Sequence, residues 1–206
     1  IELSKKMFKN ADIIIDRFHL VQHMKVAMQK TRSQTMKKFK THSYKYRLLK
    51  KHFILLNKFR YELDAINYRR WTRNGKLMTT LQFVDHILSF DETLSESYWI
   101  YQDFLKSMKY NDYEFIESIT GKKDIVKSQY LLTALNTLNN YLPYIKNTLE
   151  CNYTNGYVEG FNNLIKVIKR IAFGYRSFRR FKNRILIISK KTEIKKGLKS
   201  YDLNPL

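Results

Sequence analysis

The sequence is poor in residues that interrupt helices and in residues that cross-link a chain. Its 206 residues include 6 glycines, 2 prolines and 1 cysteine. Long stretches without a breaker favour long helices over a fold with many turns. The single cysteine, Cys151, excludes an internal disulfide and a cysteine-based zinc cluster, which fits a reducing cytosol.

Long apolar runs are absent as well. No stretch approaches the ~20 residues that a membrane-spanning helix needs, and no secretory signal is visible. We therefore expect a cytoplasmic protein with no membrane segment. Hydrophobic residues nevertheless make up 44% of the chain and aromatic residues 15%. This content is enough to build a packed core and argues against general disorder.

Positive charge is what the sequence has in excess, with a net charge of +21. Residues 17–76 carry 17 Lys and Arg against 2 acids, and residues 166–206 carry 13 against 2. The segment between them, residues 77–165, carries 6 against 11. Two basic segments that flank an acidic one indicate two surfaces facing nucleic acid, because neutralising phosphates releases counterions. An acidic membrane surface is a second possible partner, but the basic segments contain no isolated amphipathic anchor.

Most of the chain shows helical spacing of its apolar residues, and one short segment does not. The consecutive β-branched residues Ile13 to Ile15 predict a buried strand over residues 11–16. A turn is predicted at the RNGK sequence of residues 73–76. Helices are predicted at residues 18–38, 157–172 and 177–188. Residues 44–70 are predicted to form one or two helices, residues 79–118 a helical stretch with a break capped at Ser89 or Asp91 and Ser95, and residues 124–149 a helix interrupted by Pro143.

The segment DIIIDRFHLVQ, residues 12–22, places an acid at the end of the predicted strand. Asp16 would be held rigidly there, where α/β proteins place catalytic groups. Arg17 and His19 add positive charge beside it. The alternative is that Asp16 only caps the following helix and that His19 makes a local hydrogen bond.

A second segment, residues 154–181, contains the predicted helix 157–172 with one polar face. That face carries a carboxylate followed at steps of 4, 3 and 4 by an amide and two cations, which are Glu159, Asn163, Lys166 and Arg170. These four side chains therefore share one stripe of the helix. An ordinary solvated face, with the acid near the helix N-terminus favoured by the helix dipole, is one interpretation of this stripe.

The two segments together resemble the ISL3 family of insertion-sequence transposases. The family motif reads approximately D-R-F-H, then N-x-x-x-E-G-x-N-N-x-I-K-x-I-K-R-x-x-x-G-Y-R-x-F. This chain has DRFHLVQ and, far downstream, NGYVEGFNNLIKVIKRIAFGYRSFRRFKNRIL. The resemblance covers about residues 1–40 and 150–190, and the middle agrees only in being long and helical.

The resemblance implies a ribonuclease-H-like core with a DDE triad, in which Asp16 matches the second acid and Glu159 the third. Glu159 lies 143 positions after Asp16, which leaves room for a helical insertion. We therefore expect a mostly α fold with a partial ribonuclease-H-like α/β core. Its parts are core at residues 1–40, a helical insertion at 41–150, a return to the core at 151–190 and a basic tail at 191–206.

The implied activity is metal-dependent DNA cleavage and strand transfer at transposon ends. Two Mg²⁺ (or Mn²⁺) ions, roughly 3.5–4 Å apart, would activate the attacking oxygen and stabilise the leaving one. Asp16 and Glu159 would each supply a ligand, because Mg²⁺ prefers carboxylate oxygens. The implied partner is DNA, both terminal repeats and target, with the complete protein a homo-oligomer associated with the bacterial nucleoid.

Further residues are predicted to position the DNA backbone without reading its sequence. They are Arg17, His19, Asn163, Lys166, Lys169, Arg170, Arg176, Arg179 and Arg180. Plain surface charge is the alternative for the cations. The aromatic residues of the basic middle would either stack on unpaired bases or belong to the core, and these are Tyr44, Tyr46, Tyr68 and Trp71.

One acid of the triad has no match in these 206 residues. Only 15 residues precede Asp16, and neither Glu2 nor Asp12 lies in a matching motif. The zinc-binding and helix-turn-helix regions that begin the family's proteins are not matched either. We therefore expect the chain by itself to be an inactive transposase fragment. The alternative is a non-catalytic, basic helical module that binds nucleic acid and derives from a decayed element.

The unmatched acid leads to a direct prediction. The 206-residue chain should give no Mg²⁺-dependent nicking of transposon-end DNA, because one metal ligand is lacking. A labelled oligonucleotide resolved on a denaturing gel measures this, with a Mg²⁺-free reaction as control. Robust nicking that depends on Mg²⁺ would contradict the expectation.

Overall fold

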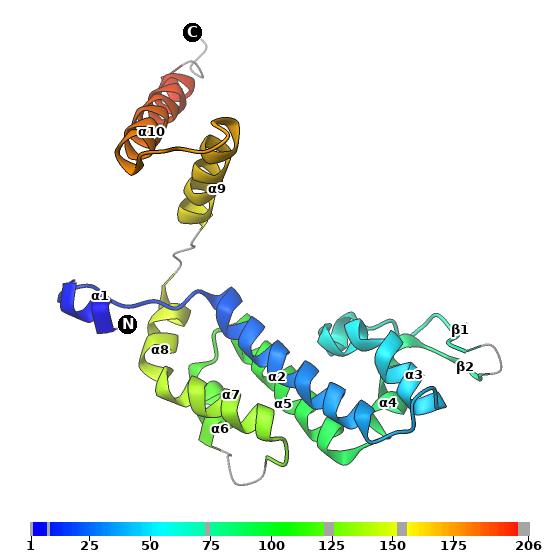
Figure 1. The fold of residues 1–206 in the computed structure, drawn as a ribbon. Coiled ribbons are helices and arrows are strands. Elements are labelled where there is room, and N and C mark those ends of the chain that lie inside the picture. The colour runs from blue at the N-terminus through cyan, green and yellow to red at the C-terminus, as the bar shows by residue number, and fades with distance from the viewer. Residues whose placement is uncertain (1, 8, 73–74, 122–125, 152–155, 202–206) are drawn as a thin grey trace. The chain divides into compact units, whose positions relative to one another are not determined.

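The computed structural model describes residues 2–7, 9–72, 75–121, 126–151 and 156–201. These residues divide into two compact units, Ile1–Tyr153 and Thr154–Leu206. Helices dominate both units, so the prediction of a mostly α chain is confirmed (Figure 1). The boundary after Tyr153 falls close to residue 151, where the sequence predicts a return to the core. The assignment of either part to a core or an insertion remains a prediction.

The first unit is built on two long helices, α2 (Arg17–Lys37) and α5 (Glu92–Tyr110) (Figure 1). A short helix, α1 (Glu2–Met7), comes before them. The elements between them are α3 (Tyr44–Lys51), the 3-10 turns η1 (Phe53–Asn57) and η2 (Arg60–Glu62), the strands β1 (Arg69–Arg70) and β2 (Leu77–Met78), and α4 (Thr80–Leu88). After them come α6 (Tyr113–Gly121), α7 (Gln129–Asn140) and α8 (Leu142–Glu150).

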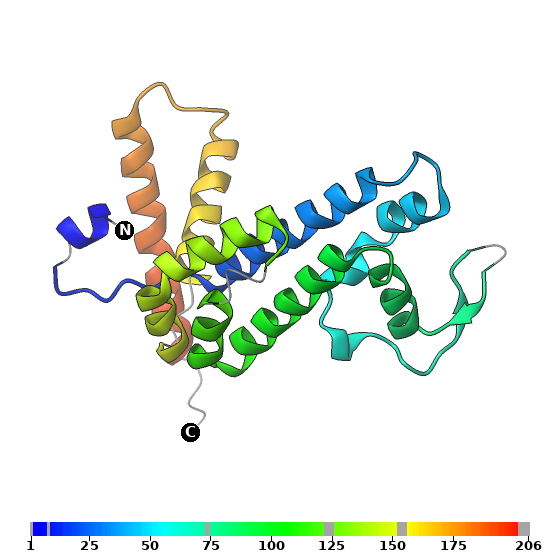
Figure 2. The ribbon, with the colours of Figure 1, turned by 90° about the horizontal axis from the view of Figure 1, so that it is seen from below.

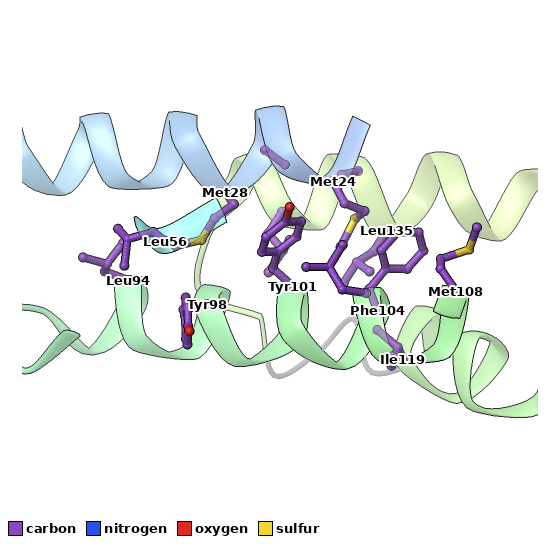
Figure 3. Packing of buried hydrophobic residues seen from close by; sticks show 14 of the residues in the cluster. Met24, Met28, Leu56, Leu94, Tyr98, Tyr101, Phe104, Met108, Ile119 and Leu135 are labelled. Atoms are coloured by element: carbon purple, nitrogen blue, oxygen red, sulfur yellow. The ribbon is translucent and has the colours of Figure 1, made fainter. Parts of the chain in front are cut away.

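The core of this unit lies where α2 packs against α5 and α7. One face of α2 is buried at helical spacing, with Leu20, Met24, Ala27, Met28, Thr31 and Thr35. Figure 3 shows Met24 and Met28 directed toward Tyr98, Tyr101 and Phe104 of α5, with Leu135 of α7 beside them. Burial raises the pKa of the Tyr101 hydroxyl to about 12. The aromatic and methionine side chains therefore fill the buried interior of this unit.

Polar side chains fix where several of these helices begin. Asp91 accepts a hydrogen bond from the backbone N–H of Leu94 at 2.9 Å and thereby caps α5. Thr79 and Gln82 form a capping box at the start of α4. Ser128 caps α7 and also shares a hydrogen bond with Thr31 of α2. The caps satisfy N–H groups that have no partner inside the helix.

The prediction of a strand at residues 11–16 is wrong. The backbone there pairs with no other strand, and the two-stranded β1–β2 hairpin is the only sheet among the described residues. Instead, the N–H of Ile15 donates to Thr148 Oγ1 at 2.9 Å, and that hydroxyl donates to the carbonyl of Ile15 at 2.8 Å. Asn147 donates to the carbonyl of Ile13. Side chains of α8 thus replace a neighbouring strand, and a ribonuclease-H-like core remains a prediction.

Of the one or two helices predicted over residues 44–70, one α-helix forms and ends at Lys51, and the chain up to residue 70 is not α-helical. The Asp64 carboxylate accepts from the backbone N–H groups of Ile66 and Asn67, each at 2.9 Å. Such a local turn competes with a helix for the same backbone groups. The chain then forms β1 and β2, in which Arg69 lies opposite Met78. In the predicted turn at residues 73–76, Arg73 and Asn74 lie outside the described residues, and the N–H of Gly75 donates to the carbonyl of Thr72.

The second unit consists of α9 (Gly156–Ile171) and α10 (Phe178–Tyr201). The range of α9 agrees with the predicted helix over residues 157–172, whereas α10 extends well past the predicted end at Ile188. The two helices contact each other, and Ile168 of α9 is buried. Gly174, with φ of +110°, turns the chain between them.

The packing of α2 predicts the effect of two matched substitutions. Met24→Ala should lower the free energy of unfolding by about 2–5 kcal/mol, because Met24 is fully buried and its loss leaves a cavity. Val26→Ala, on the exposed face of the same helix, should change it by less than about 0.5 kcal/mol. Denaturant unfolding of both variants measures the difference. Equal effects would show that the α2–α5 contact is not the core.

Candidate functional site

Asp16 is the N-cap of α2. Its Oδ1 atom accepts a hydrogen bond from the N–H of Phe18 at 2.8 Å, and its carbonyl accepts from the N–H of His19 at 3.0 Å. The capping interpretation of the sequence is therefore confirmed. Capping uses one carboxylate oxygen, and Oδ2 has no hydrogen bond within the described residues. One oxygen thus orients the carboxylate while the other stays available to a ligand.

Arg17, the next residue, ties the start of α2 to the ends of two other helices. Its guanidinium donates to Asn111 Oδ1 at 2.7 Å, at the end of α5. It also donates to the carbonyls of Thr148 and Leu149 in the last turn of α8, both at 3.3 Å. A cation is favourable there, because helix C-termini carry partial negative charge and unpaired carbonyls. The predicted DNA contact of Arg17 is untested, and its donors are directed into the protein.

His19 and Phe18 lie on the exposed side of the same turn. The Phe18 side chain is 65% exposed, and its ring meets the His19 ring edge-on with centroids 5.7 Å apart. His19 is exposed too, and its side chain makes no hydrogen bond within the described residues. The local hydrogen bond proposed for His19 from sequence is therefore not seen. Whether His19 contacts a phosphate remains a prediction.

Glu159 lies in the first turn of α9, in the second unit, whereas Asp16 belongs to the first. Its side chain is exposed and has no hydrogen bond or ion pair within the described residues. Asp16 and Glu159 thus belong to different compact units. Among the described residues, no cluster of three or more His, Cys, Asp or Glu side chains could hold a metal ion. Asp16 and Glu159 nevertheless offer the free carboxylate oxygens that Mg²⁺ prefers.

The polar side chains predicted to contact DNA in the second unit are all exposed. They are Asn163, Lys166, Lys169, Arg170, Arg176, Arg179 and Arg180. The opposite side of α9 is more protected, at Phe161, Leu164, Ile165, Ile168 and Ala172. The predicted separation of an apolar side from a polar one is therefore seen in part, because Ile171, which the sequence places on the apolar side, is 69% exposed. No carboxylate neutralises these cations within the described residues.

The aromatic residues considered for base stacking differ in what they can reach. The Trp71 ring stacks on Phe83 at 3.9 Å with an interplanar angle of 2°, and the Arg69 guanidinium lies 3.7 Å from the Trp71 ring centre. Neighbouring side chains therefore occupy the ring, and Trp71 belongs to the core edge. Tyr44 packs beside His86 and stays 45% exposed, and Tyr68 is 61% exposed.

Sequence reasoning missed the residues that hold Asp16 in place. Thr148 and Asn147 fix the segment before it, and Asn111 receives Arg17. Each of the three is separated by 94 to 134 positions along the chain from the residue to which it is hydrogen-bonded. No motif surrounds them, so only the packing of α5 and α8 against α2 brings them together.

Comparison with known proteins identifies the class. A family model described as a transposase matches residues 1–185, which is most of the chain. The chain belongs to the ISL3 family of insertion-sequence transposases, which are of the DDE type. The resemblance seen in the two sequence segments is thereby confirmed.

A curated relative and the solved structures add less. A protein of Lactococcus lactis subsp. lactis named ATP-dependent protease is 41% identical over 115 residues. The matched stretch covers 56% of this chain and 37% of that protein, so the chain spans little more than a third of that relative. That name describes the relative alone. No solved structure matches the chain significantly.

The hydrogen bonds of Arg17 predict that replacing this residue lowers the stability of the fold. Arg17→Ala should lower the free energy of unfolding by about 1.5–3 kcal/mol, because helix-end carbonyls lose a charged donor. Arg17→Lys should recover only part of it, since an ammonium cannot reproduce the planar fork. His19→Ala, on the exposed side, is the control and should be close to neutral. An Arg17→Ala variant as stable as the wild type would show that these bonds contribute nothing.

Proposed function

We propose that this chain supplies two of the three catalytic acids of a DNA transposase, Asp16 as the second and Glu159 as the third. The single observation that carries the proposal is the family match over residues 1–185, which includes both motifs. The reaction would be cleavage at transposon ends followed by strand transfer. The DNA, the metal and the oligomer are likewise proposed, since the chain covers only part of the relative.

Asp16 would act through a carboxylate whose direction is fixed before any ligand arrives. Capping holds its Oδ1 atom, and the hydrogen bonds of Arg17 and Thr148 fix the backbone on either side. A carboxylate that needs no reordering binds a ligand at a lower entropic cost. Asp16 would therefore present Oδ2 to a metal with little loss of conformational freedom.

Glu159 would complete the site from the start of α9. Bound divalent metal would supply activation of the attacking oxygen and stabilisation of the leaving one. The cations that follow Glu159 on the same helix would hold the DNA backbone near the acids, since Lys166 and Arg170 share its face. Their exposure and lack of acidic partners support this role.

The role of Glu159 is tested in the transposase that carries the complete triad. Glu159→Gln should abolish Mg²⁺-dependent cleavage of transposon-end DNA while DNA binding survives, because the amide keeps the shape but is a poor metal ligand. Glu150→Gln, on the exposed surface at the end of α8, is the matched control and should cleave normally. Gel-shift and cleavage assays on the same DNA separate binding from chemistry.

Two results would contradict this assignment. Cleavage that persists in the Glu159→Gln protein would remove Glu159 from the site. DNA binding that is salt-sensitive, with no metal-dependent cleavage by the complete wild-type protein, would favour the non-catalytic binding module instead.

A further inference from the structure

A second basic surface lies in the first unit. A hollow of about 800 Å³ opens between α3, the β1–β2 hairpin and α4. Figures 1 and 2 both show these elements near the C-terminal end of α2. Arg47 and Lys51 line the hollow from one side of α3, and Lys76 lines it from the hairpin. Three cations from two separate elements therefore face one space.

No acid balances these cations. The residues that line the hollow include no Asp or Glu, and Arg47, Lys51 and Lys76 form no ion pair within the described residues. Like charges this close repel one another, and the repulsion is relieved when an anion binds among them. Elsewhere in the same unit, Lys38 pairs with Asp91 and Arg60 with Asp85. Many cations of this unit have no ion pair, so what distinguishes the hollow is that three of them, from two elements, line one space.

The wall of the hollow carries a polar atom without a partner. The Nε2 atom of His52 is buried and makes no hydrogen bond within the described residues. Burial lowers the pKa of His52, and the charges of Lys51 and Arg69 lower it further. The neutral imidazole is thus favoured at this wall, where its ring packs edge-on against Trp71 and Phe83.

We propose that this hollow binds phosphates of the DNA backbone, with Arg47, Lys51 and Lys76 as the contacting side chains. The inference rests on the proposed function, because it takes DNA as the ligand. It adds a contact surface in the helical middle of the chain, where no family motif lies. A duplex is favoured over a small anion because cations on two elements, open to solvent, can follow successive phosphates.

The fold also sets how far this contact lies from Asp16. Arg32 of α2 donates to the carbonyl of Leu49 at 2.8 Å and so joins α3 to α2. Arg32 follows Asp16 by 16 positions, which is roughly 24 Å along a helix at 1.5 Å per residue. The junction of α3 with α2 therefore lies roughly 24 Å along α2 from Asp16.

The test measures duplex binding by the 206-residue chain across a range of salt concentrations. The probe is a 40-base-pair DNA of mixed sequence. The triple variant Arg47→Gln, Lys51→Gln and Lys76→Gln should weaken binding and reduce the slope of log K against log salt by roughly 2–3, since each phosphate contact contributes about 0.9. A slope equal to that of the wild-type chain would overturn the inference.

The control variant removes the same charge from other surfaces of the unit. Lys50→Gln, Lys106→Gln and Lys146→Gln lie on α3, α5 and α8, outside the hollow, and all three side chains are exposed. This variant should change the slope by less than about 1, as expected for a general charge effect. If this control reduced the slope as much as the triple variant of Arg47, Lys51 and Lys76 (the hollow variant), net charge alone would explain the binding. That result would also overturn the inference.

A second measurement uses the unaltered chain and so does not depend on how the variants fold. DNA should protect Lys51 and Lys76 from an amine-modifying reagent, whereas Lys106 should stay reactive. Unprotected Lys51 and Lys76 in a chain that binds DNA would overturn this inference and leave the catalytic proposal intact. A wild-type chain that binds no DNA would contradict both.

A further experiment with lipid vesicles distinguishes DNA from an anionic membrane surface as the ligand of the hollow. Vesicles of phosphatidylcholine with phosphatidylserine should bind the wild-type and hollow variants alike. If the hollow variant lost binding to vesicles but kept its binding to DNA, the surface would be a lipid site and the inference would be overturned. Among the described residues, no helix is long and apolar enough to cross a membrane, so any such contact would be at the membrane surface.

Discussion

The burial of one face of α2 against α5 and α7 is the constraint on which the first unit depends. Met24 and Met28 fit between aromatic side chains of α5, and this contact fixes the direction of α2 (Figure 3). The N-terminal end of α2 then places Asp16, and its C-terminal half places α3 through Arg32. Displacing α2 would therefore move the acid and the basic hollow together, because an interior packed this closely is not continuously deformable.

Positive charge is handled differently in the interior and on the surface. Arg17 is satisfied by carbonyls at two helix ends, so its charge serves the fold. The cations of α9, like those around the hollow, have no acidic partner among the described residues. Unpaired surface cations in such number destabilise the compact state by repulsion and favour binding to a polyanion. The same excess charge would thus lower the stability of the free protein and favour the proposed binding to DNA.

Asp16 shows that a helix cap can leave one carboxylate oxygen without a hydrogen bond among the described residues. Sequence reasoning treated the cap and the metal ligand as alternatives, but the carboxylate has two oxygens and capping occupies one. The cap fixes the rotamer, and Arg17 fixes the helix start, so the free oxygen has a defined direction. The supporting residues come from α5 and α8, far along the chain, which explains why no local motif announces them.

The sequence by itself determined the family, the helical class and the ends of α2 and α9, because these depend on local spacing and on two long motifs. It misjudged residues 11–16, since β-branched residues favour an extended backbone but cannot state what will pair with it. It also predicted helix as far as residue 70, where Asp64 forms a local turn instead. Only the tertiary structure decided that Trp71 is covered and that Arg47, Lys51 and Lys76 surround one hollow. The physical reason is that such meetings depend on long-range packing, which residue spacing along one segment does not encode.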